Sequence, residues 1–124
     1  MAKIFLLLGS LLMALAVVIG AFGAHGLEGR LSERMMKNYQ TGVQYHMIHG
    51  IGLLLVGLVA IKLASSSLLT GAGWSFVVGI VLFSGSLYAM ALTGVTKLGA
   101  ITPIGGLAFI IGWILLGIAV VRGL

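Results

Sequence analysis

Charged residues divide the sequence into four long hydrophobic runs. The uncharged stretches cover residues 4–27, 38–61, 63–96 and 98–121. A hydrocarbon core of roughly 30 Å needs about 20 helical residues, and backbone groups in lipid must form their hydrogen bonds within their own segment. Each run can therefore cross a membrane as a helix. The pattern predicts an all-α membrane protein whose four transmembrane helices form an up-down bundle.

Local signals set the expected ends of these helices. Gly23 and Gly26 close the first helix, residues 64–67 (ASSS) indicate a turn, and Trp74 is typical of an interfacial anchor. Thr102 followed by Pro103 favours a helix start, since Thr caps well and Pro is tolerated in the first turn. We expect a single transmembrane domain over residues 1–124, with helices near residues 3–24, 42–61, 71–93 and 103–122.

The second hydrophobic run has a polar extension at its start. Ser32 is typical of an N-cap, and no proline interrupts the chain from there to Lys62. One continuous helix would be about 45 Å long at 1.5 Å per residue, which exceeds the hydrocarbon core. The segment near residues 32–41 is therefore predicted to be a juxtamembrane amphipathic segment, in or above the headgroups.

The 20 glycines indicate how the helices pack. Hydrophobicity does not drive helices together in lipid, so small residues that allow close backbone approach mark the contact faces. Small residues recur at intervals of three, four or seven on the first and fourth predicted helices, and two glycines fall on one side of the second. The expected packing positions are Gly9, Ala16, Gly20 and Gly23 on the first, Gly42 and Gly57 on the second, and Gly105, Ala108 and Gly112 on the fourth.

Composition supports a lipid environment. Of 124 residues, 60% are hydrophobic and 7% charged, and the mean hydropathy is +1.25, outside the range of ordinary soluble domains. The net charge of +5 reflects only two acidic residues rather than a basic patch, so no nucleic-acid partner is expected. The absence of cysteine excludes disulfides and thiolate metal sites.

Polar side chains collect in the half of the bundle next to the first and third connections. Five of them are predicted to form a polar mouth there: His25, Tyr45, His46, His49 and Tyr88. At about 100° per residue, His46 and His49 fall on the side of their helix that also carries Gly42 and Gly57, so both are expected to face other helices. Ionisable residues inside a membrane are functional candidates. Three roles stay open for these histidines, namely bridging helices, handling a ligand or proton, and binding a metal or haem.

Several short strings carry a family resemblance. They are GAFGAHGL at residues 20–27, YQ at 39–40, YH at 45–46, GSLY at 85–88, ITPIGG at 101–106 and GW at 112–113. Together they resemble the YwdK/YgdD family of small bacterial membrane proteins over nearly the whole chain. The resemblance implies a multi-pass protein of the cell inner membrane in a family catalogued as uncharacterised, and it supplies no activity.

Three functions from different classes remain open. The leading hypothesis is an accessory or interaction protein that contacts the lipid bilayer and a larger membrane partner or a second copy of itself. The second is a small transporter, although residues 4–24 lack the carboxylate on which small multidrug exporters depend. The third is haem or metal binding through His25 with His46 or His49. No catalytic residue, resident metal or cofactor is predicted.

The distribution of cations gives the first testable prediction. Lys3, Lys62 and Arg122 lie on the side of the termini, and Arg30, Arg34, Lys37 and Lys97 lie on the other side. The cluster at residues 30–37 is the densest, so the positive-inside rule places the first connection in the cytoplasm. Cysteines introduced at positions 30 and 97 should react only with membrane-permeant reagents in intact cells. Labelling exclusively from outside would reverse the orientation, and labelling from both sides would indicate dual topology.

Overall fold

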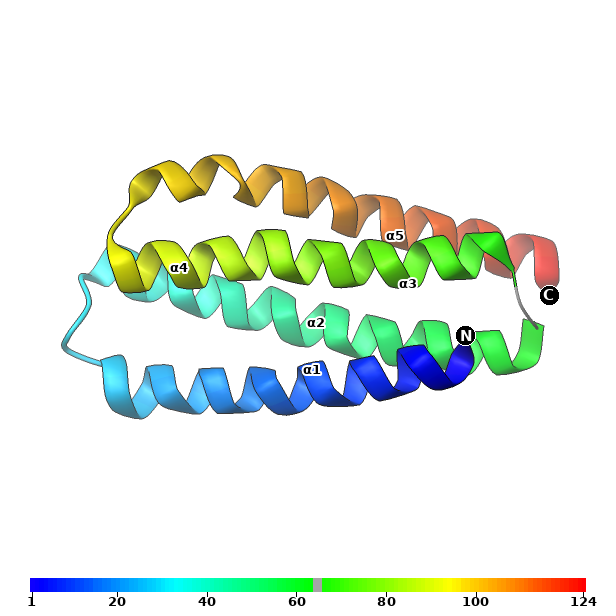
Figure 1. The fold of residues 1–124 in the computed structure, drawn as a ribbon, viewed down its shortest axis with the longest axis horizontal. Coiled ribbons are helices and arrows are strands. Elements are labelled where there is room, and N and C mark those ends of the chain that lie inside the picture. Colours follow the sequence, from blue (N-terminus) through cyan, green and yellow to red (C-terminus); the bar gives the residue numbers. More distant parts are fainter. Residues whose placement is uncertain (64–65) are drawn as a thin grey trace.

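The chain forms four antiparallel helical rods (Figure 1). The computed structural model describes residues 1–63 and 66–124. Its elements are α1 (Ala2–Phe22) with the π-helical turn η1 (Gly23–Leu27), α2 (Glu33–Leu63), α3 (Ser67–Gly79) with η2 (Ile80–Ser84) and α4 (Gly85–Thr93), and the short 3-10 turn η3 (Thr96–Ala100) before α5 (Thr102–Gly123). All four rods are long and apolar enough to cross a membrane. The predicted all-α fold with four membrane-crossing helices is confirmed.

The helix starts follow local hydrogen bonding. The Ser32 hydroxyl accepts a bond from the Met35 N–H at 3.2 Å, as expected of an N-cap. Thr102 does not cap α5, contrary to its predicted role. The N-cap is Ile101, whose carbonyl accepts from the N–H groups of Ile104 and Gly105. Thr102 is the first residue of α5, and its hydroxyl pairs with the Ser86 hydroxyl at 2.6 Å. Residues 64 and 65 of the predicted turn lie outside the described part of the chain.

Helix α2 runs without a break through the predicted amphipathic segment 32–41 and the predicted span 42–61. Its 31 residues correspond to about 46 Å. Tyr39 in the first part is only 2% exposed, and its hydroxyl donates to the Ile19 carbonyl of α1. The start of α2 is therefore fastened along α1. The level at which the membrane surface crosses α2 stays a prediction.

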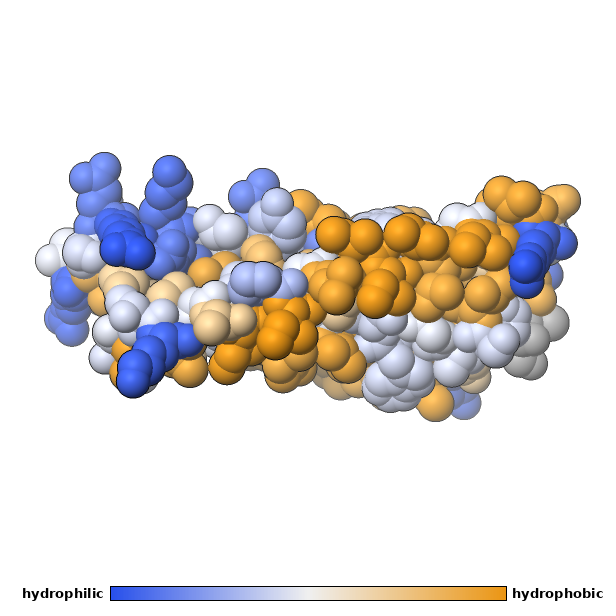
Figure 2. All heavy atoms as spheres, turned by 90° about the horizontal axis from the view of Figure 1, so that it is seen from above, coloured by the Kyte–Doolittle hydropathy of each residue, from blue (hydrophilic) through white to orange (hydrophobic). Residues whose placement is uncertain are grey.

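Polar and apolar residues separate along the bundle axis. On the face in Figure 2, strongly hydrophilic residues gather near the two ends, and most of the surface between them is apolar. Large apolar side chains such as Leu11, Val18, Ile51, Val81 and Ile114 are exposed on the rods. In water this apolar surface would cause aggregation, but in a bilayer it is the surface that the lipid chains solvate.

Aromatic rings lie against glycines of neighbouring helices throughout the interior. A Cβ atom added at the glycine would collide with the ring in each case. The pairs are Phe5 with Gly73, Tyr39 with Gly23, Phe76 with Gly112, Tyr88 with Gly42, and Phe109 with Gly79. The largest buried cluster contains three of these rings, Phe5, Phe76 and Phe109, packed with aliphatic side chains such as Leu53 and Leu69.

The structure also locates the small residues predicted to mediate packing. Gly9, Ala16, Gly23, Gly42, Gly57, Gly105 and Gly112 are buried, whereas Gly20 and Ala108 are half-buried. A Cβ at Gly9 would meet Leu54, one at Gly20 would meet Val43, and one at Gly57 would meet Leu6. Gly105 makes the closest approach to a neighbouring backbone, because its Cβ would overlap the backbone of Phe83.

Gly105 and its neighbour Gly106 provide a matched test of this packing. Gly105→Ala should lower the free energy of unfolding by about 1–3 kcal/mol, the usual cost of overpacking, because the Phe83 backbone cannot rotate away. Gly106→Ala is the control, since the nearest atoms to its added Cβ are side-chain atoms of Phe83 at 3.7 and 3.9 Å. Thermal unfolding in detergent measures both variants, and equal melting temperatures would contradict the close approach.

Candidate functional site

One polar cluster joins α1, α2 and α4, and we call it the His46 cluster. It contains Tyr39, His46, Ser84 and Tyr88. His46 Nδ1 and the Tyr88 hydroxyl are 2.9 Å apart, the Ser84 hydroxyl donates to the Gly42 carbonyl at 2.7 Å, and the Tyr39 and Tyr88 rings lie 5.4 Å apart. His46 is 1% exposed. These contacts join α2 to η2 and α4, and the bond from Tyr39 to the Ile19 carbonyl adds α1.

The second ring nitrogen of His46 has no partner. Nε2 is buried and forms no hydrogen bond among the described residues. A buried polar atom without a partner costs free energy, and this nitrogen is the only buried side-chain nitrogen or oxygen without one among the described residues. Its protonation follows from the other nitrogen: if the Tyr88 hydroxyl donates to Nδ1, Nε2 carries the hydrogen, and in the reverse case Nε2 is a bare acceptor.

His49 lies in a different environment, which we call the His49 cluster (His49, Tyr45, Phe76, Phe109 and Trp113). The Trp113 indole N–H donates to His49 Nε2 at 2.9 Å. Because an indole nitrogen can only donate, Nε2 is an acceptor, and Nδ1 carries the hydrogen that bonds to the Tyr45 carbonyl at 2.7 Å. The His49 ring stacks on Phe109 with centroids 3.5 Å apart. His49 is thus held as a neutral imidazole with both nitrogens occupied.

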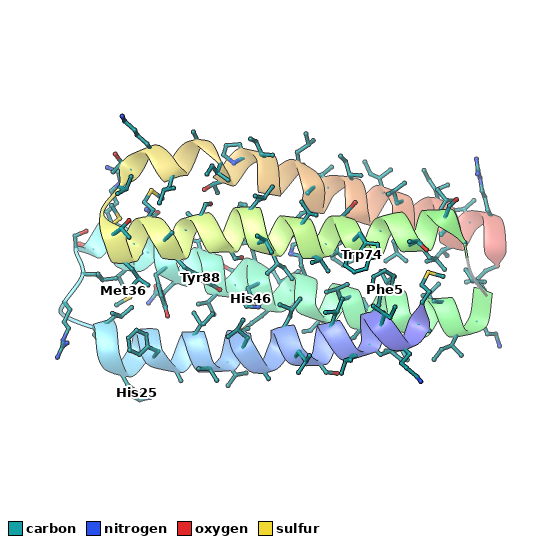
Figure 3. All side chains as sticks on the ribbon, in the orientation of Figure 1. Phe5, His25, Met36, His46, Trp74 and Tyr88 are labelled. Atoms are coloured by element: carbon teal, nitrogen blue, oxygen red, sulfur yellow. The ribbon has the colours of Figure 1, made fainter. Side chains whose placement is uncertain are left out.

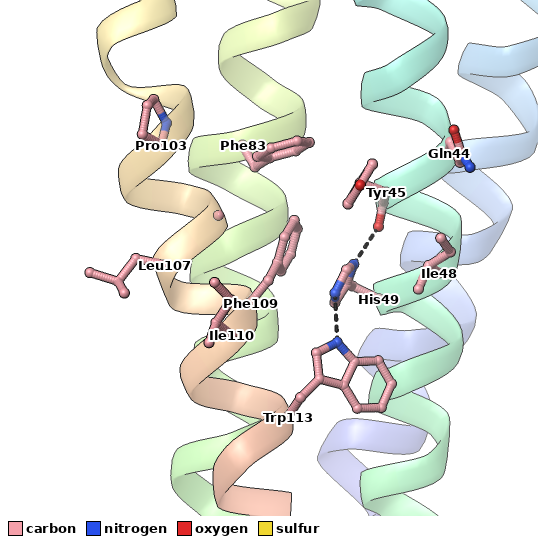
Figure 4. A pocket seen from close by; sticks show the side chains of 11 residues that line it. Gln44, Tyr45, Ile48, His49, Phe83, Pro103, Leu107, Phe109, Ile110 and Trp113 are labelled. Carbon is pink, nitrogen blue, oxygen red and sulfur yellow. Dashed lines mark hydrogen bonds between the residues drawn. The ribbon is translucent and has the colours of Figure 1, made fainter.

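A lateral groove opens beside the His49 cluster, between α2 and α5 (Figure 4). It encloses about 740 Å³. Aromatic and branched aliphatic side chains dominate its walls, and no charged residue contributes. The lining residues are Gln44, Tyr45, Ile48, His49, Phe83, Pro103, Gly106, Leu107, Phe109, Ile110 and Trp113. We call this cavity the α2/α5 groove.

The structure does not bring the five predicted residues into one polar mouth. His46 and Tyr88 meet between α2 and α4, while Tyr45 and His49 line the α2/α5 groove. His25 is exposed, and its side chain points away from the bundle in Figure 3. Helical geometry accounts for the separation. His46 and His49 are three residues apart and therefore about 60° apart around α2, enough for them to face different helices. His25 is two residues after the buried Gly23 in the turn η1, on the outer side of that turn.

The sequence analysis did not predict the aromatic residues of η2 and α5 that line the groove. The sequence analysis gave no structural role to Trp113, Phe83, Phe109 or Gln44. A signal was present, because a tryptophan N–H inside a membrane span needs an acceptor, and His49 is one of the few side-chain acceptors within the predicted spans. The other lining residues depend on how the helices are rotated and spaced relative to one another, and the sequence of one helix does not determine that.

The histidine arrangement does not fit the hypothesis of a shared metal or haem. In the described part of the chain, no three His, Cys, Asp or Glu residues lie close enough together to hold an ion. His25 lies on the outer surface, and both nitrogens of His49 are occupied by protein groups. A pair formed by His25 with either other histidine would require a rearrangement of the bundle.

Fold and site define the class: a small, multi-pass α-helical membrane protein with an uncharged lateral groove. A family model described as "Protein of unknown function (DUF423)" matches residues 19–106. The chain belongs to this DUF423/UPF0382 family of membrane proteins, and the resemblance to YwdK is confirmed.

Curated relatives match the chain over nearly its full length. UPF0382 membrane protein YwdK of Bacillus subtilis is 52% identical over 97% of this chain and 98% of its own. UPF0382 membrane protein SERP0230 of Staphylococcus epidermidis is 52% identical over 97% of each chain, and SAB0533 of Staphylococcus aureus is 47% identical over 94% of each. No solved structure matches the chain. Because these relatives come from Gram-positive bacteria, the location is a cell membrane rather than specifically an inner membrane.

The His46–Tyr88 contact can be tested by a double-mutant cycle. His46→Leu, Tyr88→Phe and the double variant should give a coupling of about 0.6 kcal/mol, the average for hydrogen bonds between membrane helices. Replacing His46 removes a structural bridge, so a small loss of stability is expected. Reversible unfolding in mixed micelles measures the cycle. The same cycle with His25→Leu in place of His46→Leu should give no coupling, and equal couplings in both cycles would contradict the arrangement.

Proposed function

We propose that this protein is a non-catalytic accessory protein of the cell membrane that binds a lipid-soluble molecule in the α2/α5 groove. The groove itself carries the proposal. It is a cavity of about 740 Å³, within the range of about 300–1,000 Å³ typical of small-molecule sites. It lies on the side of α2 away from α1, in the half of the bundle near the first and third connections. A ligand dissolved in the bilayer can reach it from the side.

The polar groups in the groove support binding rather than catalysis. His49 has both ring nitrogens occupied, so it is not free to act as a base or a nucleophile. The other polar side chains there, Gln44 and Tyr45, are uncharged hydrogen-bonding groups of low reactivity. No Asp, Glu, Lys or Arg side chain lines the cavity. These groups suit recognition of a ligand better than proton transfer.

No observation favours the alternative of a small transporter. Glu28 and Glu33, the only acidic residues in the sequence, are both exposed near the first connection. The His46 cluster faces α1 and α4 rather than the groove, so the polar groups of α2 are divided between its two sides. The following experiment distinguishes a small molecule in the groove from a larger membrane protein or a second copy of this chain.

Ile110 and Ile114 allow a matched crosslinking test. Both are isoleucines of α5 with 57% exposure, but only Ile110 lines the groove. A diazirine-bearing amino acid at position 110, activated by light in native membranes, should give a discrete small-molecule adduct by intact-protein mass spectrometry. Position 114 should give only the pattern of bulk phospholipids. Identical patterns would overturn the proposed function, and a protein adduct at position 110 alone would replace the small molecule by a protein partner.

A further inference from the structure

We propose that the ligand of the α2/α5 groove is a quinone-type lipid: a planar, uncharged ring with carbonyl oxygens, attached to an isoprenoid tail. This inference rests on the proposed function and specifies the chemical class of the ligand. It concerns binding only, with no electron transfer in this chain. Three features of the groove support it, namely its lack of charge, its aromatic walls and its free hydrogen-bond donors.

The lack of charge argues against a phospholipid headgroup. The nearest basic residue before Gln44 on α2 is Lys37, seven residues away and so about 10 Å towards the first connection. No Lys or Arg lines the groove. A phosphate drawn to Gln44 and Tyr45, inside the predicted span 42–61, would be desolvated without a counter-charge, which is costly in hydrocarbon. A headgroup that reaches these residues is therefore uncharged.

The aromatic walls suit a flat ring. The Tyr45 and Phe83 rings lie 4.7 Å apart, the Phe83 and Phe109 rings 5.4 Å apart, and Phe109 stacks on His49. Figure 4 shows Tyr45 and Phe109 between the two helices that form the groove, with Trp113 farther along it. A planar ligand ring can stack or meet these rings edge-on, with a gain of about 0.5–1.5 kcal/mol per aromatic pair. Ile48, Leu107 and Ile110 provide an aliphatic wall for a branched tail.

The free donors suit carbonyl oxygens. Tyr45 is 38% exposed, and neither its hydroxyl nor the Gln44 amide forms a hydrogen bond to any described residue. Inside the predicted span 42–61, lipid chains do not solvate polar groups, so a ligand with acceptor oxygens would satisfy them. His49 cannot provide this bond, because Tyr45 and Trp113 already occupy its nitrogens. We therefore assign ring recognition to Tyr45, with Gln44 as a second donor.

The two tryptophans make this inference measurable. Trp113 lines the groove, whereas Trp74 packs against Phe5, well away from it. Trp74→Phe therefore leaves Trp113 as the only indole reporter, and Trp113→Phe leaves Trp74 as the control. Quinones quench indole fluorescence on contact, so a bound quinone should quench Trp113 at concentrations at which dissolved quinone has little effect.

The experiment uses the full chain in vesicles of phosphatidylcholine and phosphatidylglycerol, titrated with menaquinone-4. In the Trp74→Phe protein, quenching should saturate, and in the Trp113→Phe protein it should rise linearly, as for a collisional quencher. Adding Tyr45→Phe to the Trp74→Phe protein should weaken the apparent affinity about fivefold through loss of one hydrogen bond. Geranylgeraniol, which has the tail without the quinone ring, should not compete. Linear quenching in both proteins, or equal competition by geranylgeraniol, would overturn the inference.

Two glycine variants separate this inference from the proposed function. Gly106→Leu, in the Trp74→Phe background, places a side chain in the groove and should abolish saturable quenching. Gly117→Leu, outside the lining and with no atom within 4 Å of its added Cβ, should leave quenching unchanged. If Gly106→Leu removes the crosslinked adduct at position 110 but menaquinone-4 never binds, the groove holds a ligand of another class and only the quinone assignment fails. If Gly106→Leu changes neither the crosslinked adduct at position 110 nor the quenching by menaquinone-4, both proposals fail.

Discussion

The close contact between aromatic rings and glycines is the interaction on which the bundle depends. Lipid chains solvate leucine as well as a neighbouring helix does, so helix association must come from van der Waals packing and hydrogen bonds. A ring that lies directly on backbone gains many contacts at a position where any Cβ would intrude. This arrangement explains why 20 glycines, which would weaken helices in water, are compatible with four long helices here. It also fixes the rotation of each helix, and hence the surroundings of each histidine.

The sequence was sufficient to predict what depends on one helix at a time. The charge-free runs identified the four spans, Ser32 identified the start of α2, and the spacing of glycines identified contact faces. What could not be predicted depends on two or more helices together. The proposed convergence of His25, His46 and His49 required their rotations to agree, and about 60° around α2 was enough to send His46 and His49 to different neighbours. Thr102 pairs with Ser86 for a similar reason, because its partner lies on another helix.

Helix α2 is the wall shared by two unlike polar environments. On one side, His46 meets Tyr88 and keeps one nitrogen without a partner. On the other side, both ring nitrogens of His49 are hydrogen-bonded and its ring stacks on Phe109. His49 therefore offers no free hydrogen-bonding group to the groove. The hydrogen bonds of His46 are thus incomplete and lie inside the protein. Those of His49 are complete and lie beside the groove. Completion of the His49 network is what leaves Tyr45 and Gln44 as the groups available to a ligand.

The length of α2 has a consequence for how the protein responds to its membrane. At about 46 Å, this helix is longer than a hydrocarbon core of about 30 Å, and Tyr39 fastens its projecting part to α1. Hydrophobic mismatch therefore cannot be relieved by bending the start of α2 alone. A thicker bilayer covers more turns of the joined helices, and a thinner one exposes more of them. The depth of Gln44 and Tyr45 below the headgroups changes with the length of helix that the bilayer covers. Bilayer thickness therefore sets how far a ligand headgroup must move below the membrane surface to enter the groove.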